Sequence, residues 1–511
     1  MEKDIPANPL RADLVSRAAA EPCTLVIFGA TGDLTRRKLI PALYNLAADG
    51  NLPSGLAVVC FARRDKTSEG FREELGEATR KYSRRPVNEE LWRQFAAHIF
   101  YHRSSFDEAG GYASLATELE GIDERFGTRG NRLFYLASSP TEFDIILEHL
   151  RGSGLSHAKP GSWARLIVEK PFGTDYPSAQ RLNTAVASAF PERETFRIDH
   201  YLGKETAQNL MVLRFANTVF EALWNHRYVE NVQITASELL GVETRAGYYE
   251  KSGAMRDMVQ NHLLQLLCLT AMEPPTDLEA DAVRDEKVKV LRALRPLTGD
   301  AVAANVVRAQ YTEGFINGHD VPAYRQEPGV DPGSMTETYV ALRLHIDNWR
   351  WAGVPFFMRV GKRLPKSATE IAIQFRGTPP VLFNRESQLR DANALIIRIQ
   401  PDEGISFRMA AKLPGTLLQI EPVKMDFHYG TSFGKATPEA YERLLLDAMS
   451  GDATLFARRD EVEHAWQFVD GIRAAWQDGS APRLDFYAAG TWGPREADDL
   501  LAQDGAAWRR L

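Results

Sequence analysis

Strand patterns alternate with helical patterns over the first two hundred residues of the chain. Continuous apolar runs lie at 24–29, 56–62, 132–137 and 165–169. Such runs are typical of parallel strands that are buried on both faces. Helical periodicity follows at about 36–50 and again at 142–150. This alternation predicts a Rossmann-like α/β fold, a doubly wound parallel sheet with right-handed crossovers.

The pattern changes after about residue 200. Helical stretches cover 204–226 and 253–272, and strand-like runs of alternating polarity follow at 338–346 and 370–375. Alternating polarity is typical of antiparallel sheets, so we expect a larger α+β domain with a mainly antiparallel sheet. The segment 313–335 is rich in Gly, Pro and Asp and is expected to be a surface loop.

The length of 511 residues also predicts more than one domain, because one core rarely extends so far. The first 21 residues mix both charges with two prolines and have no apolar core. We therefore expect an N-terminal arm at 1–21, and not a secretory signal. The Rossmann-like domain is expected at 22–199 and the α+β domain at 200–511.

Composition narrows the classes of function. The net charge of −7 argues against a nucleic-acid binder or a protein that coats acidic membranes. No segment has the apolar length needed to span a bilayer. The three cysteines are far apart and odd in number, with no CxxC pair, which argues against disulfides and zinc knuckles. These features predict a cytoplasmic protein without a metal.

A glycine-containing turn joins the first strand to the first helix. Glycines there permit a tight turn and let backbone N–H groups approach a pyrophosphate, which a helix N-terminus also favours. The spacing differs from GxGxxG, and an ordinary strand–helix turn remains the alternative. The candidate coenzyme residues are Gly29, Ala30, Thr31, Gly32, Asp33 and Leu34.

The end of the second strand bears on the choice of coenzyme. NAD binders place an acidic side chain there, whereas this chain has Arg63 and Arg64. A guanidinium suits a 2′-phosphate by charge and by geometry, so NADP is the predicted coenzyme. Solvated loop arginines are the alternative.

Two further segments carry candidate substrate-binding groups. Lys170 follows a buried strand and precedes a proline, which favours an extended backbone at the ligand-binding edge of the sheet. The segment RIDHYLGK at 197–204 combines phosphate donors at His200, Tyr201 and Lys204 with a carboxylate that could orient a histidine. The alternatives are a surface lysine that ends a strand and a charged interdomain turn.

A further histidine, His262, lies within a predicted helix. At α-helical spacing it shares a face with Met258, Val259 and Leu266, as a core histidine would. A partly buried imidazole held by a carboxylate is also what a general base requires near neutral pH. The spacing leaves both interpretations open. Asp257 lies five residues earlier and is not expected on the same α-helical face.

Seven segments, spread over nearly the whole chain from Pro22 onward, resemble one enzyme family. They are GATGDLTRRKLIPAL, EKPFG, RIDHYLGKE, RDMVQNHLLQLL, DEKVKVL, NWRWAGVPFFMRVGKRLP and YAAGTWGP. Together they resemble the glucose-6-phosphate dehydrogenase family, and RIDHYLGKE is highly specific. The resemblance implies an NADP-dependent oxidoreductase that converts glucose 6-phosphate to its 6-phospho-lactone, the first step of the oxidative pentose phosphate pathway.

The resemblance also assigns roles to individual residues. His262 would be the general base and Asp199 its partner, with the 6-phosphate held by His200, Tyr201 and Lys204. The coenzyme would lie on Gly29 to Leu34 and Arg63, near Lys170. The groups implied for the sugar hydroxyls are Lys170, Glu238, Asp257 and Lys362.

One position departs from the family pattern. Many relatives have a basic residue where this chain has Ser367, whereas Lys366 lies one place earlier.

The resemblance also bears on assembly, and two other functions remain as alternatives. A homodimer or homotetramer formed through the second domain is usual for the family. The alternatives are an oxidoreductase for an unphosphorylated sugar and a non-catalytic NADP-binding sensor on the same fold.

Overall fold

The computed structural model describes residues 20–378, 393–415, 419–430, 438–479 and 483–511. The predicted arm at 1–21 therefore lies almost wholly outside the described residues. The chain forms two compact units. The first comprises 20–138, 148–167 and 445–452, and the second comprises 139–147, 168–444 and 453–511.

The first unit is built on parallel strands. β1 pairs in parallel with β2 and β4, and β2 pairs with β3. The strands of this unit have the order β5-β4-β1-β2-β3. This is the order of a Rossmann-like sheet, as predicted. The strands are β1 Thr24–Phe28, β2 Ala57–Ala62, β3 Ile99–Arg103, β4 Arg132–Leu136 and β5 Ala164–Val168.

Amphipathic helices connect these strands. Their buried positions are apolar, for example Phe71 and Leu75 in α2, and their other faces are charged. Asn88 caps α3, its side chain accepting from the backbone N–H groups of Glu90 and Leu91. The helices are η2 Thr35–Leu39, α1 Ile40–Ala48, α2 Ser68–Tyr82, α3 Glu89–Ala96, α4 Ala109–Phe126 and α5 Phe143–Gly152.

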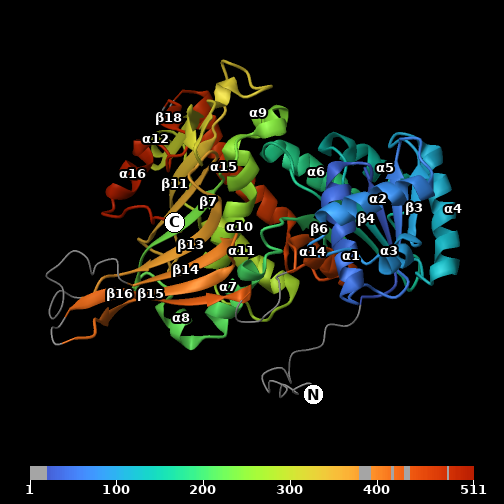
Figure 1. The fold of residues 1–511 in the computed structure, drawn as a ribbon, viewed down its shortest axis with the longest axis horizontal. Coiled ribbons are helices and arrows are strands. Elements are labelled where there is room, and N and C mark those ends of the chain that lie inside the picture. The colour runs from blue at the N-terminus through green and yellow to red at the C-terminus, as the bar shows by residue number, and fades with distance from the viewer. Residues whose placement is uncertain (1–19, 379–392, 416–418, 431–437, 480–482) are drawn as a thin grey trace. The chain divides into compact units, whose positions relative to one another are not determined.

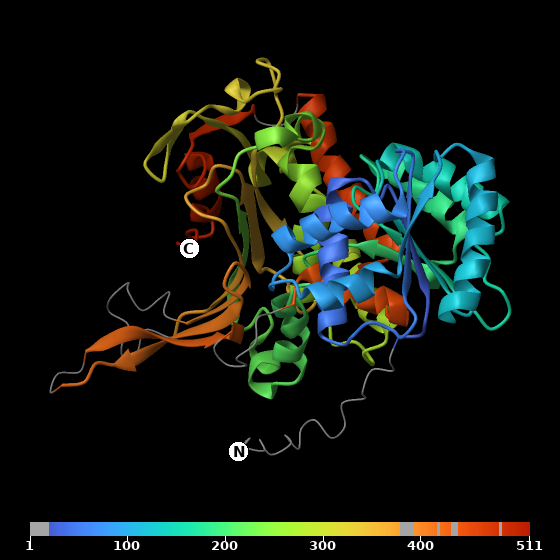
Figure 2. The same cartoon turned by 45° about the vertical axis from the view of Figure 1, so that its right-hand side comes forward.

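The second unit contains a nine-stranded sheet, mainly antiparallel as predicted. Its order is β16-β15-β14-β13-β7-β12-β11-β8-β18, and the pairs β12–β7 and β18–β8 are parallel. The β15–β16 hairpin extends from one edge of the sheet (Figures 1 and 2). The strands are β7 Val229–Ser237, β8 Val306–Thr312, β11 Tyr339–His345, β12 Pro355–Gly361, β13 Ala368–Phe375, β14 Ala394–Gln400, β15 Gly404–Lys412, β16 Ile420–His428 and β18 Asp485–Ala488.

Helices of the second unit lie alongside this sheet, as the labels α10, α11 and α15 show (Figure 1). Within the described ranges, every helix is too short or too polar to traverse a lipid bilayer. The remaining elements are α6 Tyr176–Ala189, β6 Thr195–Ile198, α7 Glu205–Phe215, α8 Thr218–Leu223, α9 Ala246–Ala254, η6 Met255–Leu263, α10 Leu264–Ala271, α11 Ala280–Ala293, α12 Asp300–Asn305, α14 Ala440–Ser450, β17 Phe456–Ala457, α15 Arg459–Gln477 and α16 Arg495–Ala502.

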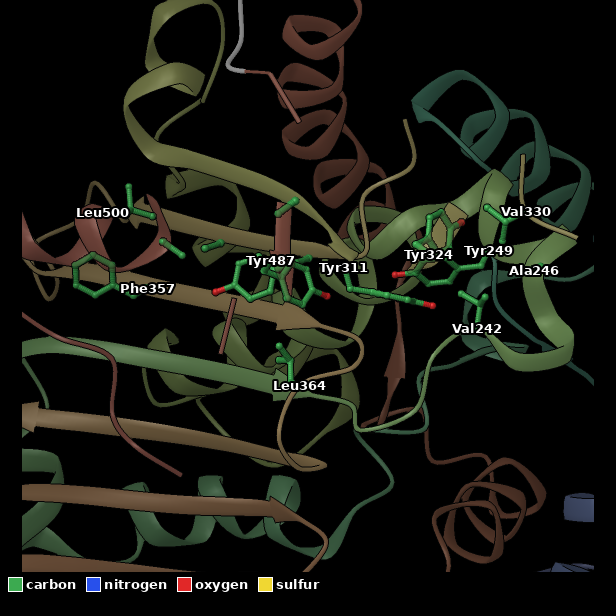
Figure 3. Close-up of a cluster of buried hydrophobic side chains, with 14 of the residues drawn as sticks. Val242, Ala246, Tyr249, Tyr311, Tyr324, Val330, Phe357, Leu364, Tyr487 and Leu500 are labelled. Carbon is green, nitrogen blue, oxygen red and sulfur yellow. The ribbon is translucent and has the colours of Figure 1, made fainter. Parts of the chain in front are cut away.

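The prediction of a surface loop at 313–335 is wrong in part. A short hairpin forms there from β9 Gly314–Ile316 and β10 His319–Val321. Tyr324 in the same segment is fully buried. It belongs to an aromatic core cluster in which the rings of Tyr249, Tyr311 and Tyr324 lie side by side (Figure 3). The local composition predicted exposure, but burial of this ring outweighs it.

The predicted helix at 253–272 is present but is wound differently at its start. Residues 255–263 form a π-helix, η6, which continues into α10. It starts after Gly253, whose φ of 61° and ψ of 178° are essentially restricted to glycine. A Cβ atom at Gly253 would lie 2.2 Å from Oε1 of Glu337. That carboxylate accepts from the Met255 N–H and so caps the start of η6.

Candidate active site

Two strand ends bring the first candidate groups to the site. β5 ends at Val168, and Lys170 follows in a cis peptide bond to Pro171. β6 ends at Ile198, so Asp199 is the next residue, and it is almost fully buried. Both side chains therefore follow the carboxyl end of a strand, the usual ligand-binding edge of such sheets.

The centre of the site is a buried pair of Asp199 and His262. Nδ1 of His262 lies 2.5 Å from Oδ1 of Asp199, and the imidazole is fully buried. The same carboxylate oxygen accepts from the backbone N–H of Tyr201 at 2.9 Å. The carboxylate is thereby oriented from a second direction, and it fixes the plane of the imidazole.

The other nitrogen of His262 faces Lys170. Nζ of Lys170 lies 2.9 Å from Nε2 of His262. An ammonium group can only donate, so Nε2 bears the lone pair and Nδ1 bears the proton. The pair therefore holds the imidazole in the tautomer in which Nε2 can accept a proton.

Charge and burial set the protonation states of this pair. Burial would raise the pKa of Asp199, but its electrostatic interaction and hydrogen bond with His262 lower that pKa to about 2. Burial lowers the pKa of His262, and the Lys170 charge lowers it further, against the opposing effect of Asp199. A carboxylate beside a neutral imidazole is the resulting state at neutral pH.

The winding of η6 changes the predicted position of Asp257. We predicted that Asp257 and His262 would not share an α-helical face, but in a π-helix the hydrogen bonds join residues i and i+5. Lys170 contacts both residues, and its Nζ lies 3.4 Å from Oδ1 of Asp257. Burial would raise the pKa of Asp257, but Lys170 and Lys362 hold it below its usual range. The π-helix thus adds a second carboxylate near the imidazole of His262.

Two of the three predicted phosphate residues, His200 and Tyr201, lie beside His262. The His200 ring lies edge-on to the His262 ring at 4.4 Å, and the Tyr201 ring stacks on it at 4.4 Å. Burial and the charges of His262 and Lys170 lower the pKa of His200 well below its ordinary value. Among the described residues, the Lys204 ammonium has no hydrogen-bond partner. It precedes α7, so it lies at the N-terminus of a helix.

An ion pair between Glu238 and Lys362 completes the set of predicted residues. Glu238 follows β7 and Lys362 follows β12, the two central strands that pair in parallel. Nζ of Lys362 lies 4.9 Å from the centre of the Tyr249 ring, and the Lys362 carbonyl accepts from the Tyr487 hydroxyl. The aromatic core in Figure 3 therefore supports this lysine.

Sequence reasoning did not find several residues of the site. The Tyr248 hydroxyl donates to Oδ1 of Asp257 at 3.1 Å. The amide of Gln400 donates to the Tyr201 hydroxyl at 3.2 Å, and Thr369 lies 3.4 Å from that hydroxyl. These residues come from distant parts of the chain, and no local motif marks them.

The departure at Ser367 has a local structural role. Its hydroxyl accepts from the Leu239 N–H at 3.0 Å, directly after Glu238. The carbonyl of Lys366 accepts from Ser237, while its side chain is exposed. The serine therefore orders the turn that carries Glu238.

The glycine turn of the first unit has the geometry needed for a dinucleotide. Gly29 has a φ of 86°, and a Cβ atom there would lie 2.8 Å from the carbonyl oxygen of Ala137. The Gly32 N–H donates to the Gly29 carbonyl at 2.9 Å, which closes the turn. Helical winding starts at Asp33 and includes Leu34, whereas Thr31 lies in the turn. The residues present therefore fit a pyrophosphate at a helix N-terminus.

The loop after β2 presents arginines to solvent. Arg63 and Arg64 are exposed. The Arg64 carbonyl accepts from the Tyr101 hydroxyl at 2.6 Å, so β3 fixes the loop. Asp65 also lies here, but its carboxylate pairs with Arg103 at 2.8 Å. The loop therefore offers guanidinium groups for a 2′-phosphate, and its acidic group is already neutralised.

Fold and site together define a class of protein. A Rossmann-like sheet with a dinucleotide turn belongs to one unit, and a buried acid–base pair among cations belongs to the other. This combination is typical of a nicotinamide-dependent oxidoreductase.

Comparison with known proteins identifies the family. The model for the glucose-6-phosphate dehydrogenase NAD binding domain matches residues 26–209, and the model for its C-terminal domain matches residues 211–509. The chain therefore belongs to the glucose-6-phosphate dehydrogenase family, an oxidoreductase family whose coenzyme is NADP.

Individual relatives and solved structures support the same family assignment. Glucose-6-phosphate 1-dehydrogenase of Chlamydia pneumoniae is 48% identical over 98% of both chains. That of Aggregatibacter actinomycetemcomitans is 50% identical over 96% of this chain and 98% of the relative. A glucose-6-phosphate dehydrogenase solved with its substrate glucose 6-phosphate is 34% identical, with a TM-score of 0.88 over 96% of this chain and 100% of the other. The predicted family, enzyme class and coenzyme are confirmed.

Proposed function

We propose that the enzyme oxidises glucose 6-phosphate at C1 with NADP, and that His262 is the general base. The observation that carries this proposal is the buried imidazole with Nδ1 on Asp199 and Nε2 available to accept a proton. The homology supports the substrate and coenzyme, and the geometry supports the base. The product is the 6-phospho-lactone.

The coenzyme is assigned to the first unit. The turn from Gly29 to Leu34 would hold the pyrophosphate, and Arg63 would bind the 2′-phosphate. When bound, NADP supplies the hydride acceptor for C1. Hydride loss leaves C1 electron-poor unless its hydroxyl is deprotonated in concert, so the chain must provide a base.

His262 meets this need in three respects. Its lowered pKa keeps the ring neutral near pH 7. Its Nε2 accepts the proton of the C1 hydroxyl, which takes the place that the Lys170 ammonium occupies in the structure. The Asp199 carboxylate then stabilises the imidazolium through Nδ1. The displaced lysine remains beside Asp257 and can bind a sugar oxygen.

The other cations and acids would hold the sugar phosphate. His200 and Lys204 donate to the 6-phosphate, and the Tyr201 hydroxyl can donate to it while still accepting from Gln400. Lys170, Asp257 and the pair of Glu238 and Lys362 bind ring hydroxyls. Phosphate binding remote from C1 provides binding energy that aligns the reacting carbon.

Substitution of the base tests this mechanism. His262→Asn should lower kcat by about 10²- to 10⁴-fold, as expected for loss of a general base. The dissociation constant of NADP, followed by fluorescence, should stay within a factor of two. NADPH formation is measured with glucose 6-phosphate and, in parallel, with glucose. His345→Asn, in β11, is the control and should retain wild-type turnover. Retained turnover in His262→Asn would refute the role of His262 as the general base.

Other parts of the proposal rest on the family resemblance alone. We propose that the reaction is the first step of the oxidative pentose phosphate pathway and occurs in the cytoplasm. We also propose a homodimer or homotetramer, with coenzyme binding assigned to 22–199 and sugar-phosphate binding to 200–511. Sedimentation of the purified protein tests the oligomeric state.

A further inference from the structure

A buried charged triad connects three helices of the second unit. Nζ of Lys287 lies 2.8 Å from Oε2 of Glu461, and both side chains are at most 1% exposed. The Gln265 amide donates to the same oxygen at 3.1 Å and accepts from Lys287 at 3.0 Å. The three side chains therefore close a ring of hydrogen bonds between α10, α11 and α15.

Stability alone is a weak reason for such a ring. Burying an ion pair has a desolvation cost that commonly cancels its Coulombic gain, so an apolar trio would be about as stable. Buried charges that satisfy each other do, however, fix the relative register of the elements that carry them. The position of Gln265 shows which element is fixed.

Gln265 lies three residues after His262 on one continuous helical segment. η6 ends at Leu263 and α10 begins at Leu264, with no interruption between them. Tethering the amide of Gln265 therefore restricts both rotation and sliding of the segment that carries the base. The tether on the other side is Glu461, in the first turn of α15.

The start of α15 and the residues before it also contact β6, the strand that directly precedes Asp199. β17, directly before α15, pairs with β6, placing Phe456 opposite Ile198. The Arg459 N–H donates to the Glu192 carboxylate at 3.0 Å, and that carboxylate binds the buried Arg197. The segment 456–461 thus contacts both β6, which precedes Asp199, and Gln265, which follows His262 on the same helical segment.

We infer that Lys287, Glu461 and Gln265 are positioning residues, which set the contact between His262 and Asp199. This inference rests on the proposed function, because the contact between His262 and Asp199 affects turnover only if His262 is the general base. A displacement of about 1 Å in a reacting group can reduce a rate about 100-fold. The pair is joined at 2.5 Å, so a small rotation of η6 would weaken it.

Gln265→Met tests the inference, because it keeps the side-chain size and the ion pair but removes both hydrogen bonds. We expect kcat to fall by about 10- to 100-fold, with KM for both ligands within threefold. Asp199 raises the pKa of His262, so a weaker contact lowers that pKa. The acid limb of the pH dependence of kcat should therefore move to lower pH.

Two further variants separate positioning from folding. Gln310→Met changes a buried amide in β8 that binds the Ser334 and Thr336 carbonyls. This control should reduce the melting temperature without changing kcat or the acid limb. The double variant Lys287→Met/Glu461→Met removes both charged partners of Gln265 without leaving an unpaired charge, although it also removes the Glu461 contact with the Arg458 N–H. It should reproduce the kinetic defect of Gln265→Met.

Combining Gln265→Met with His262→Asn distinguishes failure of the positioning role from failure of the proposed function. If the triad acts through the base, adding Gln265→Met to His262→Asn should not lower the residual rate further. An additive loss, or wild-type kcat and acid limb in Gln265→Met or in the double variant, would overturn the positioning role. Full activity of His262→Asn alone would instead refute the proposed function.

Discussion

At the scale of single residues, Lys170 is the cation in contact with the proposed base, His262. Its ammonium donates to Nε2 of His262 and lies against Asp257. Because the ammonium can only donate, this contact is compatible with an imidazole whose Nε2 carries the lone pair. The charge also contributes, after burial, to the lowered pKa of the imidazole.

Removal of this charge should shift the pH dependence of the reaction. The base is active only when neutral, so kcat/KM falls as the pH decreases through the pKa of His262. In Lys170→Met the pKa should rise, because one of the causes that lower it is lost. The acid limb should then move to higher pH. Lys251→Met, an exposed lysine in α9, is the control and should keep the wild-type limb.

The residue scale also shows what the sequence could reveal. The candidates Asp199, His262 and Lys170 were all identified in the sequence, and the structure places them in contact. The interpretation of His262 as a core residue and its interpretation as a base turn out to be compatible. The imidazole is fully buried, yet its nitrogens face a carboxylate and an ammonium group.

At the scale of elements, η6 determines which groups share the site. α-Helical periodicity separates Asp257 from His262, whereas π-helical winding lets Lys170 contact both. Sequence periodicity could not reveal this winding, whose start is preceded by the non-helical Gly253 and capped by the distant Glu337. Strand–helix alternation, in contrast, is a local signal, and it correctly predicted the parallel, Rossmann-like sheet of the first unit.

The glycine at the start of η6 should be intolerant of substitution. Gly253→Ala would place a Cβ atom against the Glu337 carboxylate in a backbone region that is essentially glycine-only. We expect a loss of about 1–3 kcal/mol in the free energy of unfolding, together with lower turnover. Thermal unfolding and kcat measure these effects. Gly247→Ala, in α9 with open space around it, should be close to wild type.

At the scale of the whole molecule, the net charge of −7 and an anionic substrate are reconciled by local clustering. Lys170, Lys204 and Lys362 come from separate elements of the second unit, after β5, before α7 and after β12. Composition could not show that these lysines lie close together. Only the fold of the second unit brings them to one site.

Ligand recognition is expected to be separable between the two units. Arg63→Ala removes a guanidinium group at the end of β2, so KM for NADP should rise about 10- to 100-fold, the value of a charge-assisted hydrogen bond. KM for NAD and for glucose 6-phosphate should stay nearly constant. Arg151→Ala, an exposed arginine of the first unit, is the control. An equal rise in KM for NADP and for NAD would show that Arg63 does not bind the 2′-phosphate.

The proposed mechanism depends most on the neutral imidazole of His262 as the proton acceptor. The most direct test is the pH dependence of kcat/KM for glucose 6-phosphate in the wild type and in His262→Asn. We predict a wild-type acid limb of slope one with its midpoint below 6.5, the ordinary pKa of histidine, and a low, flat profile for the variant. A variant that keeps the wild-type limb would show that another group accepts the proton.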